Sequence, residues 1–198
     1  MTAGVSVSPE AANPEPLGEI AARVGALLRE RGQTVAVVES SAGGLVSAAL
    51  LAIPGASAYF RGGAVVYSRR AGRALLGLTA EDMAGLRGET EPYALLIAQR
   101  VRDSHHSGWG IAETGAAGPS GSPYGDAPGR VCLAVVGGPD AVSESRTVET
   151  GGNDRPANMD LFARHLLAPS CRKARKDPLG SHESRGESAG DGHGRVRT

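Results

Sequence analysis

The chain has few aromatic residues and two cysteines, and each shortage excludes a class of protein. Phe, Trp and Tyr make up 4% of the 198 residues, whereas glycine is frequent at 29, so we expect close backbone approaches and no large aromatic core. Cys132 and Cys171 lie far apart, with no second cysteine at redox or metal spacing. This spacing argues against a disulfide scaffold, a redox motif or a zinc site, and it favours a buried, inert Cys132.

An excess of charge and a long apolar run are also missing. The 21 lysines and arginines balance the 21 aspartates and glutamates, so net charge gives no reason to expect a nucleic acid or an anionic membrane as partner. No apolar run reaches the roughly 18 residues of a membrane-spanning helix, and the amino terminus lacks a basic-then-apolar signal. We therefore expect a cytoplasmic protein that contacts neither a membrane nor nucleic acid.

Composition divides the chain into three regions. Residues 1–16 carry prolines and small residues without periodicity, which predicts a disordered leader. Residues 169–198 contain almost nothing apolar and include a basic run, which predicts a disordered basic tail. A solvated tail is favoured over a nucleic-acid site because no aromatic residues accompany the charges. The segment between them, residues 17–168, is long enough for one core.

Strand and helix patterns alternate within residues 17–168. Helical spacing or capping signals predict helices at residues 17–31, 45–51, 69–78, from 79, 92–103, and from 156 to about 167. Short apolar runs predict strands at residues 34–38, 61–68, 109–112 and 131–136, and the last can pair with 142–149 as a hairpin. This order predicts a three-layer α/β/α domain with a mixed sheet of about five to six strands.

The turn at residues 39–44 is the feature around which we expect the domain to be organised. It follows a continuously apolar strand, which indicates a strand covered on both faces, and it precedes a helix. Ligands collect at such turns because free N–H groups and the helix dipole attract anions. The turn can expose a nucleophile and surround its reacting carbonyl with backbone donors, or it can be a plain corner. The loop at residues 113–123 is long enough to be functional or disordered.

Five motifs then stand in the order found in a known family. They are Val-Glu-Ser-Ser-Ala-Gly-Gly at 38–44, Pro-Gly-Ala-Ser-Ala-Tyr-Phe at 54–60, Gly-Ala-Val-Val-Tyr-Ser at 63–68, Thr-Gly-Ala-Ala-Gly-Pro at 114–119 and Gly-Asn-Asp-Arg at 152–155. In this order the chain resembles the carboxy-terminal domain of the competence/damage-inducible protein CinA family. The resemblance covers about residues 17–167. Stand-alone members of that family are nicotinamide-nucleotide amidases.

The resemblance implies hydrolysis of the carboxamide of nicotinamide mononucleotide to nicotinic acid mononucleotide and ammonia, without cofactor or metal. A hydroxyl would attack the amide, a base would take its proton, and backbone N–H groups would receive the oxyanion. Ser40 is the first candidate nucleophile and Ser57 the second, while Tyr67 would orient groups or relay a proton. The expected substrate contacts are Glu39, Gly43, Gly44, Thr114, Gly115, Gly118 and Arg155. Arg155 and the loop would bind the ribose phosphate. Family members self-associate, so a homo-oligomer is also implied.

Three departures from the family pattern keep other functions open. Gly72 stands where the family has the lysine that is the natural base, and Arg73, one position later, stays protonated near neutral pH. Ala42 removes a hydroxyl from the turn, and the segment 122–130 lacks a lysine before proline. The chain can therefore be an amidase, a catalytically silent paralogue that binds a nucleotide, or a structural assembly partner.

Overall fold

One mixed six-stranded sheet forms the centre of the molecule in the computed structural model, which describes residues 5–6 and 15–174. The strands are β1 (Val5–Ser6), β2 (Val35–Glu39), β3 (Phe60–Val65), β4 (Trp109–Ala116), β5 (Arg130–Gly137) and β6 (Val142–Glu149). They lie in the order β1-β6-β5-β4-β2-β3. Parallel pairs are β2 with β3, β2 with β4 and β1 with β6, whereas β5 is antiparallel to β4 and to β6.

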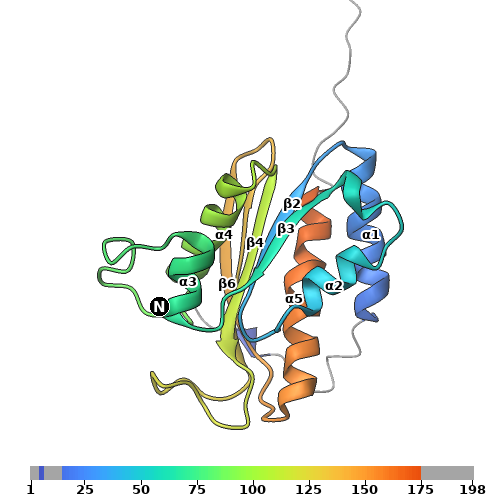
Figure 1. The fold of residues 1–198 in the computed structure, drawn as a ribbon. Helices are drawn as coiled ribbons and strands as arrows, with labels where there is room; N and C mark the ends of the chain where they lie inside the picture. The colour runs from blue at the N-terminus through green and yellow to red at the C-terminus, as the bar shows by residue number, and fades with distance from the viewer. Residues whose placement is uncertain (1–4, 7–14, 175–198) are drawn as a thin grey trace, which may run out of the picture.

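Helices cover both faces of this sheet (Figure 1). The helices α1 (Leu17–Glu30), α2 (Leu45–Leu51) and α5 (Arg155–Ala174) pack on one face, and α3 (Arg69–Leu76) and α4 (Glu91–Ser104) pack on the other. A short 3₁₀ helix, η2 (Ala56–Ala58), leads into β3. The predicted three-layer α/β/α fold is confirmed.

The central strand β2 contributes to both hydrophobic layers. Val35 and Val37 belong to the core under α1, α2 and α5, whereas Ala36 and Val38 belong to the core under α3 and α4. Each of the four is at most 3% exposed. Because successive side chains of a strand point to opposite faces, two-sided cover explains the continuous apolar run. The prediction of a buried Cys132 is also confirmed, since this residue of β5 is 0% exposed.

The hairpin of β5 and β6 forms as predicted, but the preceding loop begins later than expected. Residues 113–116, which we assigned to a loop, continue β4 and pair with β5 from Glu113↔Leu133 to Ala116↔Arg130. The glycine and threonine in this stretch read as turn residues, yet the ladder of backbone hydrogen bonds to β5 keeps it extended.

Two predicted helix boundaries were wrong. No helix begins at Thr79, although Thr79 and Asp82 exchange the reciprocal hydrogen bonds of a capping pair. Residues 80–85 form turns in place of the predicted helix. They end at Gly85, whose φ of 74° lies in the left-handed region. At the carboxyl end, α5 continues to Ala174, beyond the predicted stop near residue 167. Pro169 lies inside this helix, where it removes one backbone donor without ending the helix.

The leader and tail predictions are only partly within the described residues. Val5 and Ser6 of the predicted leader form β1, which pairs with Val148 and Glu149 and so covers the free edge of β6. Residues 1–4, 7–14 and 175–198 lie outside the described residues. Within the described part of the chain, no helix is both long enough and apolar enough to cross a bilayer.

The contact between β4 and α4 generates a stability prediction. A Cβ atom on Gly110 would lie 2.1 Å from the carbonyl oxygen of Ala98, so Gly110→Ala must push α4 away from the sheet. We expect this variant to lose at least about 2 kcal/mol of the free energy of unfolding, measured by urea denaturation. Gly18→Ala, whose Cβ would meet nothing within 4 Å in α1, should be neutral or gain up to about 1 kcal/mol. Equal stability of the two variants would contradict this packing.

Candidate functional site

The candidate site lies where two neighbouring strands send the chain to opposite faces of the sheet. After β2 the chain turns into α2, and after β3 it turns into α3 on the other face. Diverging connections leave a crevice at the carboxyl ends of such strands, which is the common ligand position in open α/β sheets. Ser40 follows β2 directly, and Tyr67 lies two residues beyond β3.

A pocket of about 250 Å³, open to solvent, occupies this crevice. The lining residues are Ser40, Ser41, Tyr67, Glu89, Arg155 and residues 115–118 and 120–123. Five of the residues predicted from the sequence therefore meet here: Ser40, Tyr67, Gly115, Gly118 and Arg155.

Two predicted residues lie elsewhere. Ser57 is exposed in η2, at the end of β3 opposite the pocket. The length of β3 separates it from the crevice, roughly 20 Å at about 3.3 Å per residue. Thr114 does not line the pocket, and its Oγ1 accepts a hydrogen bond from the Glu89 N–H at 3.3 Å. The structure thus brings neither hydroxyl to the pocket surface.

Glu39, Gly43 and Gly44 shape the turn and do not line the pocket. Glu39 is 0% exposed, and its carboxylate accepts hydrogen bonds from three N–H groups at the start of α2 and from the Ser47 hydroxyl, all at 2.7–3.0 Å. It therefore satisfies backbone donors that the helix leaves free. Gly44 precedes α2 at a φ of 101°, which a residue with a side chain rarely adopts.

Glu113 is the residue that the sequence analysis missed. It is 0% exposed in the carboxyl half of β4. Its Oε1 accepts the N–H groups of Ser40 at 2.5 Å and Ala42 at 2.7 Å, and its Oε2 accepts the Ser41 hydroxyl at 2.6 Å. Burial raises the pKa of Glu113 to about 7; the hydrogen bonds from Ser41, Ala42 and Ser40 oppose this rise, and repulsion from Glu39 adds to it. A carboxyl group that titrates near neutral pH thus holds the serine turn.

A signal for Glu113 was present in the sequence. It is the one charged residue of β4, where the apolar run of Trp109, Ile111 and Ala112 precedes it, and the apolar run of β2 also stops at a glutamate. Two buried apolar runs that stop at carboxylates indicate a shared polar site at one edge of the sheet. The loop assignment of residues 113–116 concealed this pattern.

Arg155 and Tyr67 form the cationic wall of the pocket. One guanidinium nitrogen of Arg155 donates to the Gly118 carbonyl at 2.8 Å, and another donates to the Tyr67 hydroxyl at 3.0 Å. The guanidinium also lies 5.9 Å from the centre of the Tyr67 ring. A guanidinium has five N–H donors, so it can bind a phosphate while it keeps both contacts. Among the described lining residues, Arg155 is the one cation.

The loop beyond Gly118 is braced by an ion pair. Asp126 accepts two hydrogen bonds from Arg87, at 2.5 and 3.0 Å, and one from the Ser122 hydroxyl at 2.8 Å. The hydrogen bond from Arg87 is the main cause that lowers the pKa of Asp126. The loop that the sequence left as functional or disordered is therefore held in place beside the pocket.

Glu89 adds an incompletely satisfied carboxyl group to the pocket wall. Its φ is 61°, an unusual value for a residue with a side chain, and its Oε2 is buried without a hydrogen-bond partner. Burial raises the pKa of Glu89.

Gly72, at the position of the family's lysine, lines a different pocket. That pocket is formed by α3, the segment after it and Tyr93 of α4. A Cβ on Gly72 would lie 3.1 Å from Leu78 Cδ1. In a Gly72→Lys variant, the Cβ of the new side chain would therefore contact Leu78 at the wall of this second pocket.

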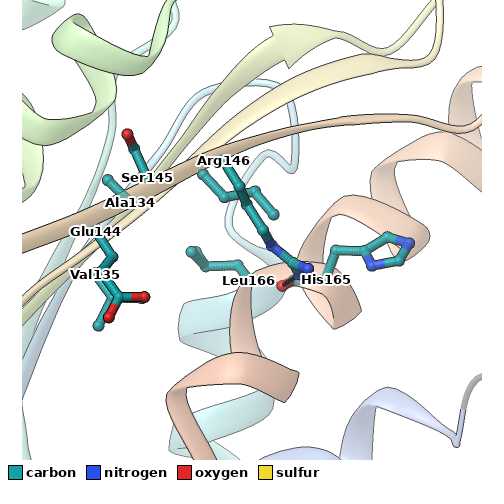
Figure 2. A pocket seen from close by; sticks show the side chains of 8 residues that line it. Ala134, Val135, Glu144, Ser145, Arg146, His165 and Leu166 are labelled. Atoms are coloured by element: carbon teal, nitrogen blue, oxygen red, sulfur yellow. Dashed lines mark hydrogen bonds between the residues drawn. The ribbon is translucent and has the colours of Figure 1, made fainter. Parts of the chain in front are cut away.

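A third pocket lies between β5, β6 and α5, as Figure 2 shows. Its walls include Leu133, Val135 and His165, and Arg146 donates to the His165 carbonyl at 2.7 Å. Burial, and secondarily Arg146, lowers the pKa of His165. No residue predicted for the active site lies here. In residues 5–6 and 15–174, no three His, Cys, Asp or Glu side chains group in a way that could hold a metal ion.

The buried position of Glu113 predicts a pH-dependent stability. Its folded pKa of about 7 exceeds the ordinary value of 4.5, so the folded state binds the proton more tightly than the unfolded state. Stability from this group is complete below about pH 4.5 and is lost as the pH rises to about 7, by roughly 3 kcal/mol. Glu113→Gln should lack this loss and should be more stable than wild type at pH 8 in urea denaturation. If the free energy of unfolding has the same pH dependence in wild type and in Glu113→Gln, this prediction is wrong.

Comparisons with known proteins agree with the motifs. Residues 17–169 match the CinA C-terminal domain family. A CinA-like protein of Synechococcus sp. (strain CC9902) is 44% identical over 118 residues, which are 60% of this chain and 28% of that protein. A CinA-like protein of Anaeromyxobacter sp. (strain K) is 40% identical over 155 residues, 78% of this chain and 38% of that protein. The chain thus spans about a third of the length of the curated relatives it matches.

Solved structures show the same fold. The CinA superfamily protein KP700603 from Klebsiella pneumoniae 700603 is 26% identical, with a TM-score of 0.75 over 81% of this chain and 98% of that chain. A CinA superfamily protein from Enterobacter cloacae, also 26% identical, has a TM-score of 0.75 over 88% and 99%. The family match over residues 17–169, together with the serine turn and the glycine-rich loop around one pocket, shows that the chain belongs to the CinA family through its C-terminal domain.

Proposed function

We propose that this chain hydrolyses the carboxamide of nicotinamide mononucleotide to nicotinic acid mononucleotide and ammonia. The observation that carries the proposal is the single pocket that contains both the serine turn and the phosphate-binding groups, Arg155 and the loop. Because the chain spans only part of its relatives, the activity, substrate and partners of the whole protein belong to this proposal as well.

The serine turn suits attack on an amide. Two hydroxyls, on Ser40 and Ser41, line the pocket beside the start of α2. Amide hydrolysis needs a nucleophile, a group that takes its proton and later protonates the leaving ammonia, and donors for the oxyanion. Backbone N–H groups of residues 115–118 are the natural donors, because this segment lines the same pocket.

The second requirement is recognition of the phosphate. The guanidinium of Arg155 can pair two donors with phosphate oxygens, and Gly118, Ser120 and Gly121 of the loop, which each carry a backbone N–H, line the same pocket. Arg155 is the first residue of α5, so its position depends on a regular element.

A nucleotide-binding protein without turnover is the second candidate. The observation that favours it is that Gly72 lies outside the pocket, and no lysine stands among the described lining residues. It predicts saturable binding of nicotinamide mononucleotide in calorimetry and no release of ammonia.

The decisive experiment measures ammonia release from nicotinamide mononucleotide and from nicotinamide riboside, which lacks the phosphate. We expect wild type to turn over the mononucleotide, and Arg155→Ala to raise its KM about 10- to 100-fold through loss of a charge-assisted contact. The riboside should be insensitive to Arg155→Ala, since it offers no phosphate. Arg61→Ala, which removes an exposed arginine of β3, should leave the KM for both substrates unchanged.

Two results would count against the proposal. No ammonia release, with tight binding of the mononucleotide, would establish the silent paralogue. An equal loss for both substrates in Arg155→Ala would show that Arg155 supports the loop through Gly118 and does not recognise phosphate.

A further inference from the structure

Two pairs of a carboxylate and a hydroxyl lie side by side at the carboxyl edge of the sheet. Because Val38 of β2 pairs with Ala112 of β4, Glu39 and Glu113 occupy the next positions of adjacent strands. Glu39 Oε1 accepts the Ser47 hydroxyl at 2.7 Å, and Glu113 Oε2 accepts the Ser41 hydroxyl at 2.6 Å. Both carboxylates are 0% exposed and accept further N–H groups.

The two pairs differ in where the hydroxyl lies. Ser41, which is 3% exposed, lines the crevice pocket, whereas Ser47 lies in α2, where a Cβ added to Gly63 of β3 would meet its Oγ at 2.5 Å. The Glu39–Ser47 pair therefore serves the packing of α2. The Glu113–Ser41 pair has a hydrogen bond of similar length at the wall of the crevice pocket.

We propose that Ser41 is the nucleophile of the site and that Glu113 is its general base. This assignment rests on the amidase function proposed above. A hydroxyl within hydrogen-bond reach of a carboxylate, itself oriented by other groups, is the general arrangement of an activated nucleophile. Here the N–H groups of Ser40 and Ala42 hold Oε1 and thereby aim Oε2 at Ser41.

The reaction balances with these two residues and water. Ser41 Oγ forms a bond to the carboxamide carbon while its proton moves to Glu113. Glu113 then gives this proton to the leaving nitrogen as the C–N bond breaks, and ammonia departs. Water attacks the resulting ester, Glu113 takes a proton from the water and returns it to Ser41 Oγ, and nicotinic acid mononucleotide is released.

The surroundings of Glu113 suit this exchange of a proton. Burial brings the pKa of Glu113 to about 7, close to the pH at which a base must both accept and release a proton. The residue also supplies the base that Gly72 cannot supply. By contrast, within the described residues the Ser40 hydroxyl makes no hydrogen bond to a base, although Ser40 lines the pocket.

A covalent serine probe tests the assignment without depending on the natural substrate. The purified chain is treated with a biotin-tagged fluorophosphonate, in which a serine oxygen bonds to phosphorus as fluoride leaves, and the modified peptide is identified by mass spectrometry. We expect the label on Ser41, no label in Ser41→Ala, and continued labelling in Ser40→Ala. Ser47→Ala is the matched control, because it loses a hydroxyl of the same geometry outside the pocket, and it should be labelled like wild type.

The role of Glu113 has its own readout. The labelling rate of wild type should rise about tenfold per pH unit below pH 7 and level off above it, whereas Glu113→Gln should react at least about 100-fold more slowly with no inflection near pH 7. Rescue of the rate by Glu113→Asp would not be expected, since the shorter side chain cannot reach Ser41 from the same strand position. Thermal melting of each variant shows whether it is folded.

The outcomes separate this assignment from the proposed function. A label on Ser40, no label on wild type, or an unchanged labelling rate in folded Glu113→Gln would overturn the pair. If Glu113→Gln does not fold, the position of the label and its pH profile in wild type still decide. A Ser41 label that follows the titration near pH 7, together with no ammonia release from nicotinamide mononucleotide, would support the pair and reject the substrate.

Discussion

The site depends on two buried carboxylates that hold the strand-to-helix turn after β2. Between them, Glu39 and Glu113 accept five backbone N–H groups and two hydroxyls from residues 40–47. A helix start leaves such donors unsatisfied, and two negative charges in one apolar edge repel each other. The arrangement is therefore stable only when the turn is folded around both carboxyl groups, which ties the conformation of the serines to the sheet beneath them.

The topology brings the remaining groups to this turn. The carboxyl ends of β2, β3, β4 and β6 and the start of β5 lie at one edge, because β5 alone runs in the opposite direction among the strands β2 to β6. Tyr67, the loop after β4 and Arg155 each follow one of these ends. Residues separated by more than a hundred positions in the chain thereby line one pocket. A site built in this way needs little ordering when a ligand binds.

Local patterns were sufficient for the elements with one clear period, and they failed where tertiary pairing decides. The apolar run of β2 and the hairpin of β5 and β6 were predictable from local patterns, whereas the meeting of Ser40, Tyr67 and Arg155 was expected from the family resemblance. Residues 113–116 were not, because their extended form comes from pairing with β5 and not from their own propensity. Ser57 was expected in the site as the second candidate nucleophile, in the motif at residues 54–60, but η2 enters β3 from the opposite end of the sheet.

In the pairing of Glu113 with Ser41, the ionisation that favours catalysis lowers the stability of the fold. The carboxylate form is the one that can take a proton from a hydroxyl, and it is also the form that burial disfavours most strongly. As the pH rises through about 7, the same ionisation that activates Ser41 removes stabilising free energy from the fold. A neutral residue at position 113 would remove this pH-dependent loss of stability, but it would also leave Ser41 without a base. A carboxyl group at a fully buried position is costly when its charge is uncompensated, and a role in the chemistry would account for its presence there.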